Sequence, residues 1–198
     1  PKLSTSASSN SLSGSTHGLA ILDNTGTFSR AAVSNSYFKA IDCTADEDSA
    51  VCLGHEALAN ASNTAAFGAN SQALLDGASA LGYGSNAAKT FSTAVGHDAF
   101  SNGSKAVSVG SSSRALGSYS TAIGNSARAI GSNAVAIGST ASASNASSIA
   151  IGQGSKARSG ESIAIGFNSN AFNTSALAIG TNSNATNINA LAIGVGSR

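Results

Sequence analysis

Eleven glycines recur at every fourteenth position of this chain, with no insertion or deletion between them. They are Gly54, Gly68, Gly82, Gly96, Gly110, Gly124, Gly138, Gly152, Gly166, Gly180 and Gly194. Most of them close the same phrase, in which a small residue, an aliphatic residue, Ala and a branched aliphatic residue precede the glycine, as in residues 134–138. A strict short period predicts a solenoid, because each repeat buries its apolar face only by stacking on the next one.

The residues before each glycine alternate in size, which is the periodicity of a β-strand. If the glycine is position 14 of its repeat, position 13 is always apolar and position 12 is Ala in nine of eleven repeats. Positions 3 and 5 are also small, and position 5 is Ala in ten of eleven repeats. We therefore predict two short strands per repeat, with the small residues at positions 3, 5, 10 and 12 inside and the larger ones at positions 11 and 13 outside.

The outward residues would form a continuous aliphatic stripe along a single chain. Such a stripe marks an interface, and sister chains around a common axis are its simplest cover. Composition also favours association, because there is no Trp or Met and a core built largely from Ala buries little area. The predicted interface residues are Val135, Ile137, Ile149, Ile151, Ile163, Ile165, Leu177, Ile179, Leu191 and Ile193.

Each repeat also needs two tight turns. The glycine at position 14 ends a strand, and we expect a positive φ there. The opposite turn, near positions 7 and 8, carries further residues that accept a positive φ. These residues are Gly103, Gly117, Gly131, Asn145, Asn173 and Asn187.

The repeat organisation predicts three segments. Residues 1–17 are Ser-rich and are expected to form a flexible tail. Residues 18–40 fit the repeat poorly and are expected to be degenerate coils that cap the solenoid, since a solenoid needs atypical ends to prevent edge-to-edge growth. Residues 41–198 carry the eleven repeats, and the last residues begin a further repeat, which indicates a piece of a longer protein.

Charge is distributed unevenly, although the net charge is only +1. Residues 42–98 hold seven acids and one base, and residues 105–198 hold six bases and one acid. Such a gradient concerns partners rather than the fold. No stretch is apolar enough to span a membrane.

Residues 133–138, Asn-Ala-Val-Ala-Ile-Gly, with Ala or Ser following at fixed offsets, resemble the YadA-like head repeats of trimeric autotransporter adhesins. The resemblance covers residues 41–198. It implies an all-β fold, with a left-handed parallel β-roll in each protomer and three protomers around one axis. It also implies display at the bacterial outer membrane, with the anchor outside this chain and no direct membrane insertion by this fragment.

The two cysteines, Cys43 and Cys52, occupy positions 3 and 12 of one repeat, both of which are predicted to face the interior. Small opposed residues imply close backbones, which suits a disulfide across one coil. The alternative is a pair of buried free thiols that stand in for Ala.

Basic residues offer the main candidate binding site. Arg114 and Arg128 share position 4 in successive coils, and Lys156 follows two coils later, with Lys105 and Arg158 in the same stretch. The ladder is either a binding stripe for an anionic or carboxylate-bearing partner or a solvated flank. Exposed aromatic residues favour binding sites, and the aromatic candidates are Tyr83 and Tyr119, with Phe91, Phe100, Phe167 and Phe172 at similar turn or flank positions. The alternative is that these rings pack between neighbouring protomers.

Catalysis, a bound metal and a cofactor are not expected. The repeat brings no nucleophile, base and orienting acid together, and His55 and His97 lie three coils apart, too far for a common metal. Nucleic acid is not an expected partner either, because aromatic residues do not alternate with the basic ones.

The sequence therefore predicts the head of a homotrimeric surface adhesin. Its expected partners are host matrix glycoproteins (collagen, fibronectin or laminin), a host cell receptor, or other copies of itself between bacteria. A passive spacer or fibre segment is one alternative. An ice- or surface-binding solenoid is another, but it would need a regular array of Thr that no column of the repeat provides.

Overall fold

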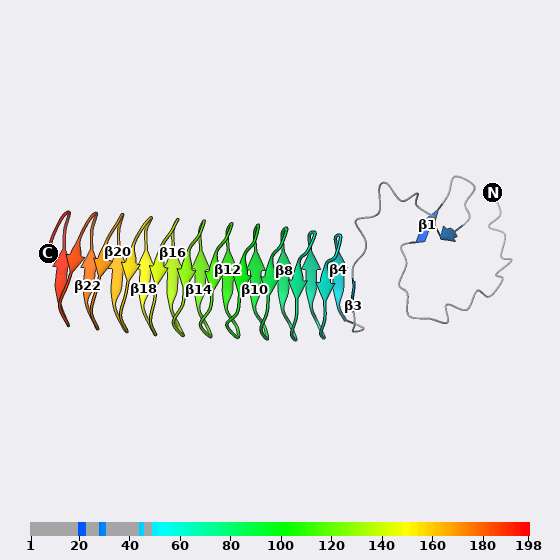
Figure 1. The fold of residues 1–198 in the computed structure, drawn as a ribbon, viewed down its shortest axis with the longest axis horizontal. Helices are drawn as coiled ribbons and strands as arrows, with labels where there is room; N and C mark the ends of the chain where they lie inside the picture. Colours follow the sequence, from blue (N-terminus) through cyan, green and yellow to red (C-terminus); the bar gives the residue numbers. More distant parts are fainter. Residues whose placement is uncertain (1–19, 23–27, 31–43, 46–48) are drawn as a thin grey trace. The chain divides into compact units, whose positions relative to one another are not determined.

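The computed structural model describes residues 20–22, 28–30, 44–45 and 49–198. The chain divides into two compact units, residues 1–39 and residues 40–198. In the second unit the described strands form two parallel sheets, and the chain crosses from one sheet to the other within every coil (Figure 1). The described residues form strands and turns only, so they include no helix long and apolar enough to cross a membrane.

The two sheets of the solenoid differ in strand length. The long sheet has eleven strands of three residues, β4 (Val51–Leu53), β6 (Ala65–Phe67), β8 (Ser79–Leu81), β10 (Thr93–Val95), β12 (Val107–Val109), β14 (Thr121–Ile123), β16 (Val135–Ile137), β18 (Ile149–Ile151), β20 (Ile163–Ile165), β22 (Leu177–Ile179) and β24 (Leu191–Ile193). The short sheet has eleven strands of two residues, β3 (Thr44–Ala45), β5 (Leu58–Ala59), β7 (Gln72–Ala73), β9 (Asn86–Ala87), β11 (Phe100–Ser101), β13 (Arg114–Ala115), β15 (Arg128–Ala129), β17 (Ser142–Ala143), β19 (Lys156–Ala157), β21 (Asn170–Ala171) and β23 (Asn184–Ala185).

Strand pairing joins each residue to its equivalent in the next repeat. Val135 pairs with Ile149 in the long sheet, and Arg128 pairs with Ser142 in the short sheet. The same offset holds between all neighbouring strands of both sheets, so equivalent residues of successive coils form straight columns. The predicted parallel solenoid, with one coil per repeat, is thus confirmed, whereas its left-handedness stays a prediction.

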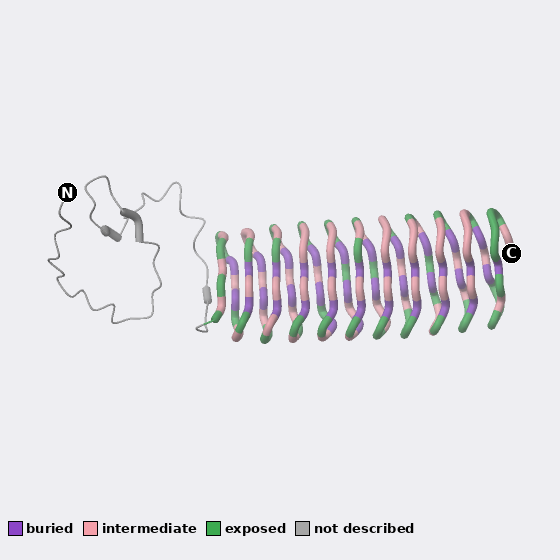
Figure 2. The backbone as a smooth tube through the Cα atoms, turned by 180° about the vertical axis from the view of Figure 1, so that it is seen from behind, coloured by how far each residue is buried: buried purple, intermediate pink, exposed green. Residues whose placement is uncertain are grey.

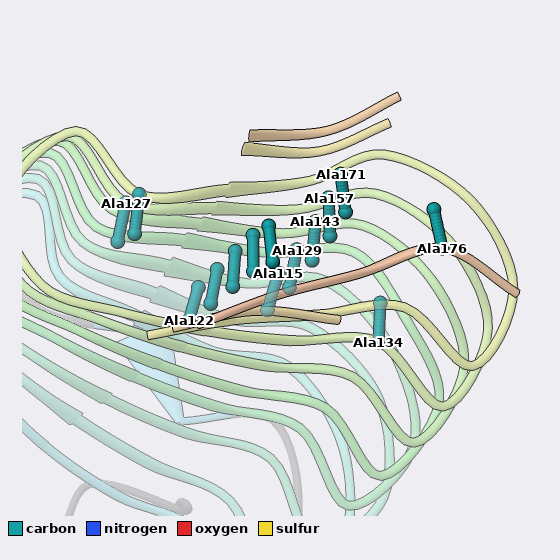
Figure 3. Close-up of a cluster of buried hydrophobic side chains, with 14 of the residues drawn as sticks. Ala115, Ala122, Ala127, Ala129, Ala134, Ala143, Ala157, Ala171 and Ala176 are labelled. Atoms are coloured by element: carbon teal, nitrogen blue, oxygen red, sulfur yellow. The ribbon is translucent and has the colours of Figure 1, made fainter. Parts of the chain in front are cut away.

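Small side chains fill the space between the two sheets. Figure 3 shows the alanines of position 5 in successive coils, among them Ala115, Ala129 and Ala143, stacked along the solenoid, and these side chains are fully buried. The buried stretches recur in the successive coils that follow residue 54, up to the last coil of the solenoid (Figure 2). The prediction that positions 3, 5, 10 and 12 lie inside is therefore confirmed.

Serine replaces alanine at many interior positions, and at most of them a backbone carbonyl oxygen of the nearby turn accepts a hydrogen bond from the serine hydroxyl group. Ser71 Oγ donates a hydrogen bond to the Gly68 carbonyl at 2.7 Å, and Ser92 Oγ donates to the Lys89 carbonyl at 2.6 Å. These acceptors lie in the turns, three residues earlier in the chain. Serine is thus tolerated inside because the turn supplies the partner that a buried hydroxyl group requires.

The alanine core is interrupted once. One cluster of buried alanines ends at Ala99 and the next begins at Ala106. Between and beside them, Ser101 and Ser108 stand where most coils have Ala, and Ser108 Oγ lies 2.7 Å from Ser113 Oγ. At this point serine hydroxyl groups make hydrogen bonds inside the solenoid, where most coils have the methyl groups of alanine.

The turns differ in part from the expectation. The glycines at position 14 have a positive φ, as predicted, with +129° at Gly124. The positive φ expected near positions 7 and 8 was wrong, because the left-handed residues of that turn stand at position 9, as at Asn133 (φ 57°). Position 2 is left-handed too, as at Thr140 (φ 56°).

Glycine is needed at position 7 of three coils because the chain is crowded there. A Cβ atom on Gly117 would lie 2.0 Å from the carbonyl oxygen of Gly131 in the next coil, and one on Gly103 would lie 1.9 Å from that of Gly117. Neither glycine has a positive φ. The missing side chain therefore serves the close approach of successive coils rather than an unusual backbone conformation.

The first unit contains a single described pair of strands. β1 (Ala20–Leu22) and β2 (Phe28–Arg30) are antiparallel, with Ile21 opposite Ser29. The predicted tail of residues 1–17 lies outside the described residues, as does most of the predicted cap of residues 18–40. The capping role stays a prediction.

Replacement of Gly117 by Ala should destabilise the solenoid. The new methyl group would overlap the backbone of the next coil, and overpacking of this kind lowers the free energy of unfolding by about 1–3 kcal/mol. Gly160→Ala is the matched control, because its Cβ would meet only the Ala146 carbonyl oxygen at 3.8 Å. Urea unfolding followed by circular dichroism compares the two variants, and equal stability would contradict the close approach.

Candidate binding face

The outer side of the short sheet gathers most of the basic residues that the sequence singled out. Arg114 and Arg128 are paired neighbours on β13 and β15, and both side chains are exposed. Ser142 follows them in the same column, and Lys156 follows Ser142. The two adjacent arginines and the more distant lysine thus form one column on the short sheet, as their shared position in the repeat predicted.

Arg158 joins this column from the side. It stands two residues after Lys156, and residues two apart at the end of a strand point to the same face of a sheet. Both side chains are exposed. We call Arg114, Arg128, Lys156 and Arg158 the basic face.

Aromatic rings flank the basic face at both ends. The guanidinium group of Arg114 lies 5.5 Å from the ring centroid of Phe100, and that of Arg158 lies 4.6 Å from the ring centroid of Phe172. Both distances are typical of cation–π contacts, which hold the cation in place over the ring. The sequence analysis missed these pairs, although the signal was available, since each ring stands exactly one repeat away from its cation.

Lys105 and Tyr119 lie apart from the basic face. Both occupy position 9, in the turn that precedes the long sheet, and Lys105 Nζ lies 5.2 Å from the ring centroid of Tyr119. They form a small pair of their own. The structure therefore does not group Lys105 with the other four basic candidates.

Tyr83 stands at the opposite turn of its coil, at position 1. Its ring stacks on that of His97 at 5.3 Å between centroids, and His97 Nδ1 lies 3.2 Å from Asp98 Oδ2. Tyr83 and Tyr119 are both more than half exposed. Since they occupy different turns, the two tyrosines do not belong to one site.

The charge of the basic face is not balanced by nearby acids. Within residues 49–198, the only ion pairs join His55 to Glu56 and His97 to Asp98. Glu161, the only acid of residues 105–198, instead accepts a hydrogen bond from Ser175 in the next coil. The basic face is therefore an uncompensated positive surface.

The predicted interface residues all lie on the outer side of the long sheet. They stand at positions 11 and 13, while the alanines between them point inward. Most are half-buried by their neighbours in the column, and Leu191 and Ile193 of the last strand are 63% and 61% exposed. Nothing in the described part of the chain covers this apolar face.

Among the described residues, no group of three or more His, Cys, Asp or Glu side chains could hold a metal ion. Cys52 is disulfide-bonded and packs against the alanine core. The only other cysteine of the chain, Cys43, lies outside the described residues. The pairing of these two cysteines stays a prediction.

Reduction should lower the melting temperature of the protein if Cys43 and Cys52 are paired. A bridge that closes so short a loop contributes about 2–3 kcal/mol, by limiting the freedom of the unfolded chain. Thermal unfolding with and without a reductant measures the effect. The variant Cys43→Ala/Cys52→Ala is the control and should not respond to the reductant, and an equal lack of response in the native protein would contradict the bridge.

Comparison with known proteins identifies the repeat. The family model described as the YadA head domain repeat (2 copies) matches residues 45–71, 76–99, 101–127, 129–155, 157–183 and 173–197, which is more than half of the chain. A solved structure of the collagen-binding domain of the Yersinia adhesin YadA is 28% identical, with a TM-score of 0.47, and the match covers 68% of this chain and 67% of that one. A comparison with curated proteins found no match.

Proposed function

Since the chain belongs to the YadA head domain family, we propose that it is the head of a homotrimeric adhesin on the bacterial surface, where it attaches to host matrix glycoproteins. The family consists of adhesin heads rather than enzymes. Segments outside this chain would anchor the head to the outer membrane.

The uncovered apolar face of the long sheet is the observation that carries this proposal. The interior of the solenoid is so thin that only Ala, Ser and similarly small residues fit between the sheets. The large apolar residues are therefore on the outside: the column at position 13 is apolar along all eleven strands, and the column at position 11 is continuously aliphatic from β16 to β24. A continuous apolar surface of this kind favours association.

Identical copies are the partners that fit this face best. Its columns repeat along the solenoid with one period, so a second copy meets the same residues at the same spacing. A closed symmetric arrangement covers the face on every chain and leaves no open edge for further growth. Three copies, as the family resemblance implies, would leave the short sheets and the turns at the surface.

A trimer would also suit an adhesin energetically. Three copies of each surface feature, on many molecules per cell, turn weak individual contacts into strong attachment through effective concentration. A rigid solenoid helps, because little conformational entropy is lost when it binds. The same rod without a ligand would be a passive spacer, which is the alternative that the binding experiment below must exclude.

Ile151→Asp should dissociate or unfold the assembly. The substitution places three carboxylates in the proposed apolar interface, where burial of an unpaired charge is strongly unfavourable. Ser142→Asp, which puts the same charge on the outer side of the short sheet, is the control and should leave the assembly intact. Light scattering gives the mass of each protein, and a monomeric native protein or a trimeric, equally stable Ile151→Asp variant would refute the interface.

The purified head should bind at least one of immobilised collagen, fibronectin and laminin in a saturable way. Multivalent attachment predicts slower dissociation from a dense surface than from a sparse one. Surface plasmon resonance at two ligand densities makes the comparison. If none of the three proteins is bound while the head is a folded trimer, attachment to these matrix proteins is wrong and the spacer role is favoured.

A further inference from the structure

The basic face carries an inference beyond attachment to matrix proteins. We propose that Arg114, Arg128, Lys156 and Arg158 bind a linear sulfated polysaccharide that lies along the solenoid axis. The proposal concerns a different class of ligand from the proposed function, so it holds whether or not the head binds collagen.

The shape of the basic face suits a linear chain. Arg114, Arg128 and Lys156 share one column, with Ser142 between the second and the third. Neighbouring strands are about 4.8 Å apart, so the column from Arg114 to Lys156 extends over about 14 Å. A small anion could meet only one or two of these cations, whereas an extended polyanion parallel to the axis meets all of them.

The electrostatics of the column also call for an anionic partner. Like charges directly opposite each other on neighbouring strands are destabilising, and Arg114 and Arg128 are such a pair. No acid of the described residues forms an ion pair with either of them. A bound polyanion would relieve this repulsion, and its own repeated charges would match the row.

The flanking rings prepare two of the cations for binding. Phe100 and Phe172 hold the guanidinium groups of Arg114 and Arg158. A planar guanidinium group that is held in this way keeps its N–H donors available for the oxygens of an anionic group. Because the cations occupy the rings, the rings are not free to stack on nucleic-acid bases, which disfavours single-stranded nucleic acid.

The gap in the column offers groups that suit a sugar. Ser142 and Ser144 lie there with their hydroxyl oxygens 3.4 Å apart, and both side chains are partly exposed. Hydroxyl groups donate and accept hydrogen bonds, as the hydroxyl groups of a polysaccharide do.

Two double variants test the site by binding to a heparin-derived decasaccharide, measured by calorimetry on the assembled head. Arg128→Gln/Lys156→Gln removes two charges from the basic face, neither of which contacts an aromatic ring. Lys105→Gln/Arg198→Gln removes two charges from elsewhere and is the matched control. We expect the first variant to bind about tenfold more weakly and the control to stay within about twofold of the native protein.

Three results would overturn the site. The first is a native head that does not bind the decasaccharide. The second is equal weakening of binding by both double variants, which would mean that only the net charge of the protein matters. The third is binding that does not weaken as the salt concentration is raised. The salt series uses the native protein alone, so it tests the proposal even if a variant unfolds. Mass should be unchanged in both variants and neither should unfold at the temperature of the assay, because all the replaced side chains are exposed and the loss of Arg128 removes a like-charge pair.

The chemical class of the ligand is tested separately. A desulfated decasaccharide, a single-stranded DNA and a polyglutamate of similar charge should bind at least tenfold more weakly than the sulfated chain. Equal binding of the DNA or the polyglutamate would refute the assignment to a sulfated polysaccharide. Collagen binding by Arg128→Gln/Lys156→Gln should equal that of the native head, and its loss together with decasaccharide binding would contradict two separate ligands.

Discussion

Backbone hydrogen bonding that holds equivalent residues of successive repeats in register is the constraint on which the rest of this structure depends. It fixes each coil directly above the previous one, so the two sheets must stay a constant, short distance apart along the whole solenoid. Only Ala, Ser and a few similarly small residues fit between them. The large aliphatic residues are thereby excluded from the interior and lie on the outer side of the long sheet, although most proteins bury residues of this kind.

The same register decides where function can lie. Because equivalent residues stack in columns, the contacts of a residue depend on the residues at the same position in the coils before and after it. Two adjacent arginines become a ladder, and a phenylalanine one repeat away from an arginine becomes its support. The apolar columns and the basic face lie on different sheets, so the proposed association and the proposed ligand binding would not compete for the same surface.

Much of this arrangement could be predicted from the sequence, because the period carries it. The alternation of small and large residues before Gly138 is enough to predict a strand, its inner and outer sides and the neighbour of each residue. The conformation of the turns could not be predicted in the same way. Gly117 suggested a left-handed residue, but its role is to let the next coil approach, and Tyr119, a bulky side chain, has the positive φ instead. Composition alone does not separate these two uses of glycine.

The grouping of the candidate binding residues was only partly predictable. The 14-residue period places Arg114 and Arg128 in one column. Arg158 stands at a different position of the repeat and shares their face only because side chains two residues apart point to the same side of a strand. Lys105 lies in the turn before the long sheet, away from this face. The register has a further consequence for the reach of the molecule. An insertion or deletion inside a strand that is not a whole number of repeats would shift later residues out of their columns, whereas extra residues in a turn can loop out and leave the columns in place. The stacked part of the solenoid therefore lengthens by whole coils. Each added coil lengthens the solenoid by about 4.8 Å. The number of repeats therefore sets the distance between the two ends of the solenoid in steps of one coil.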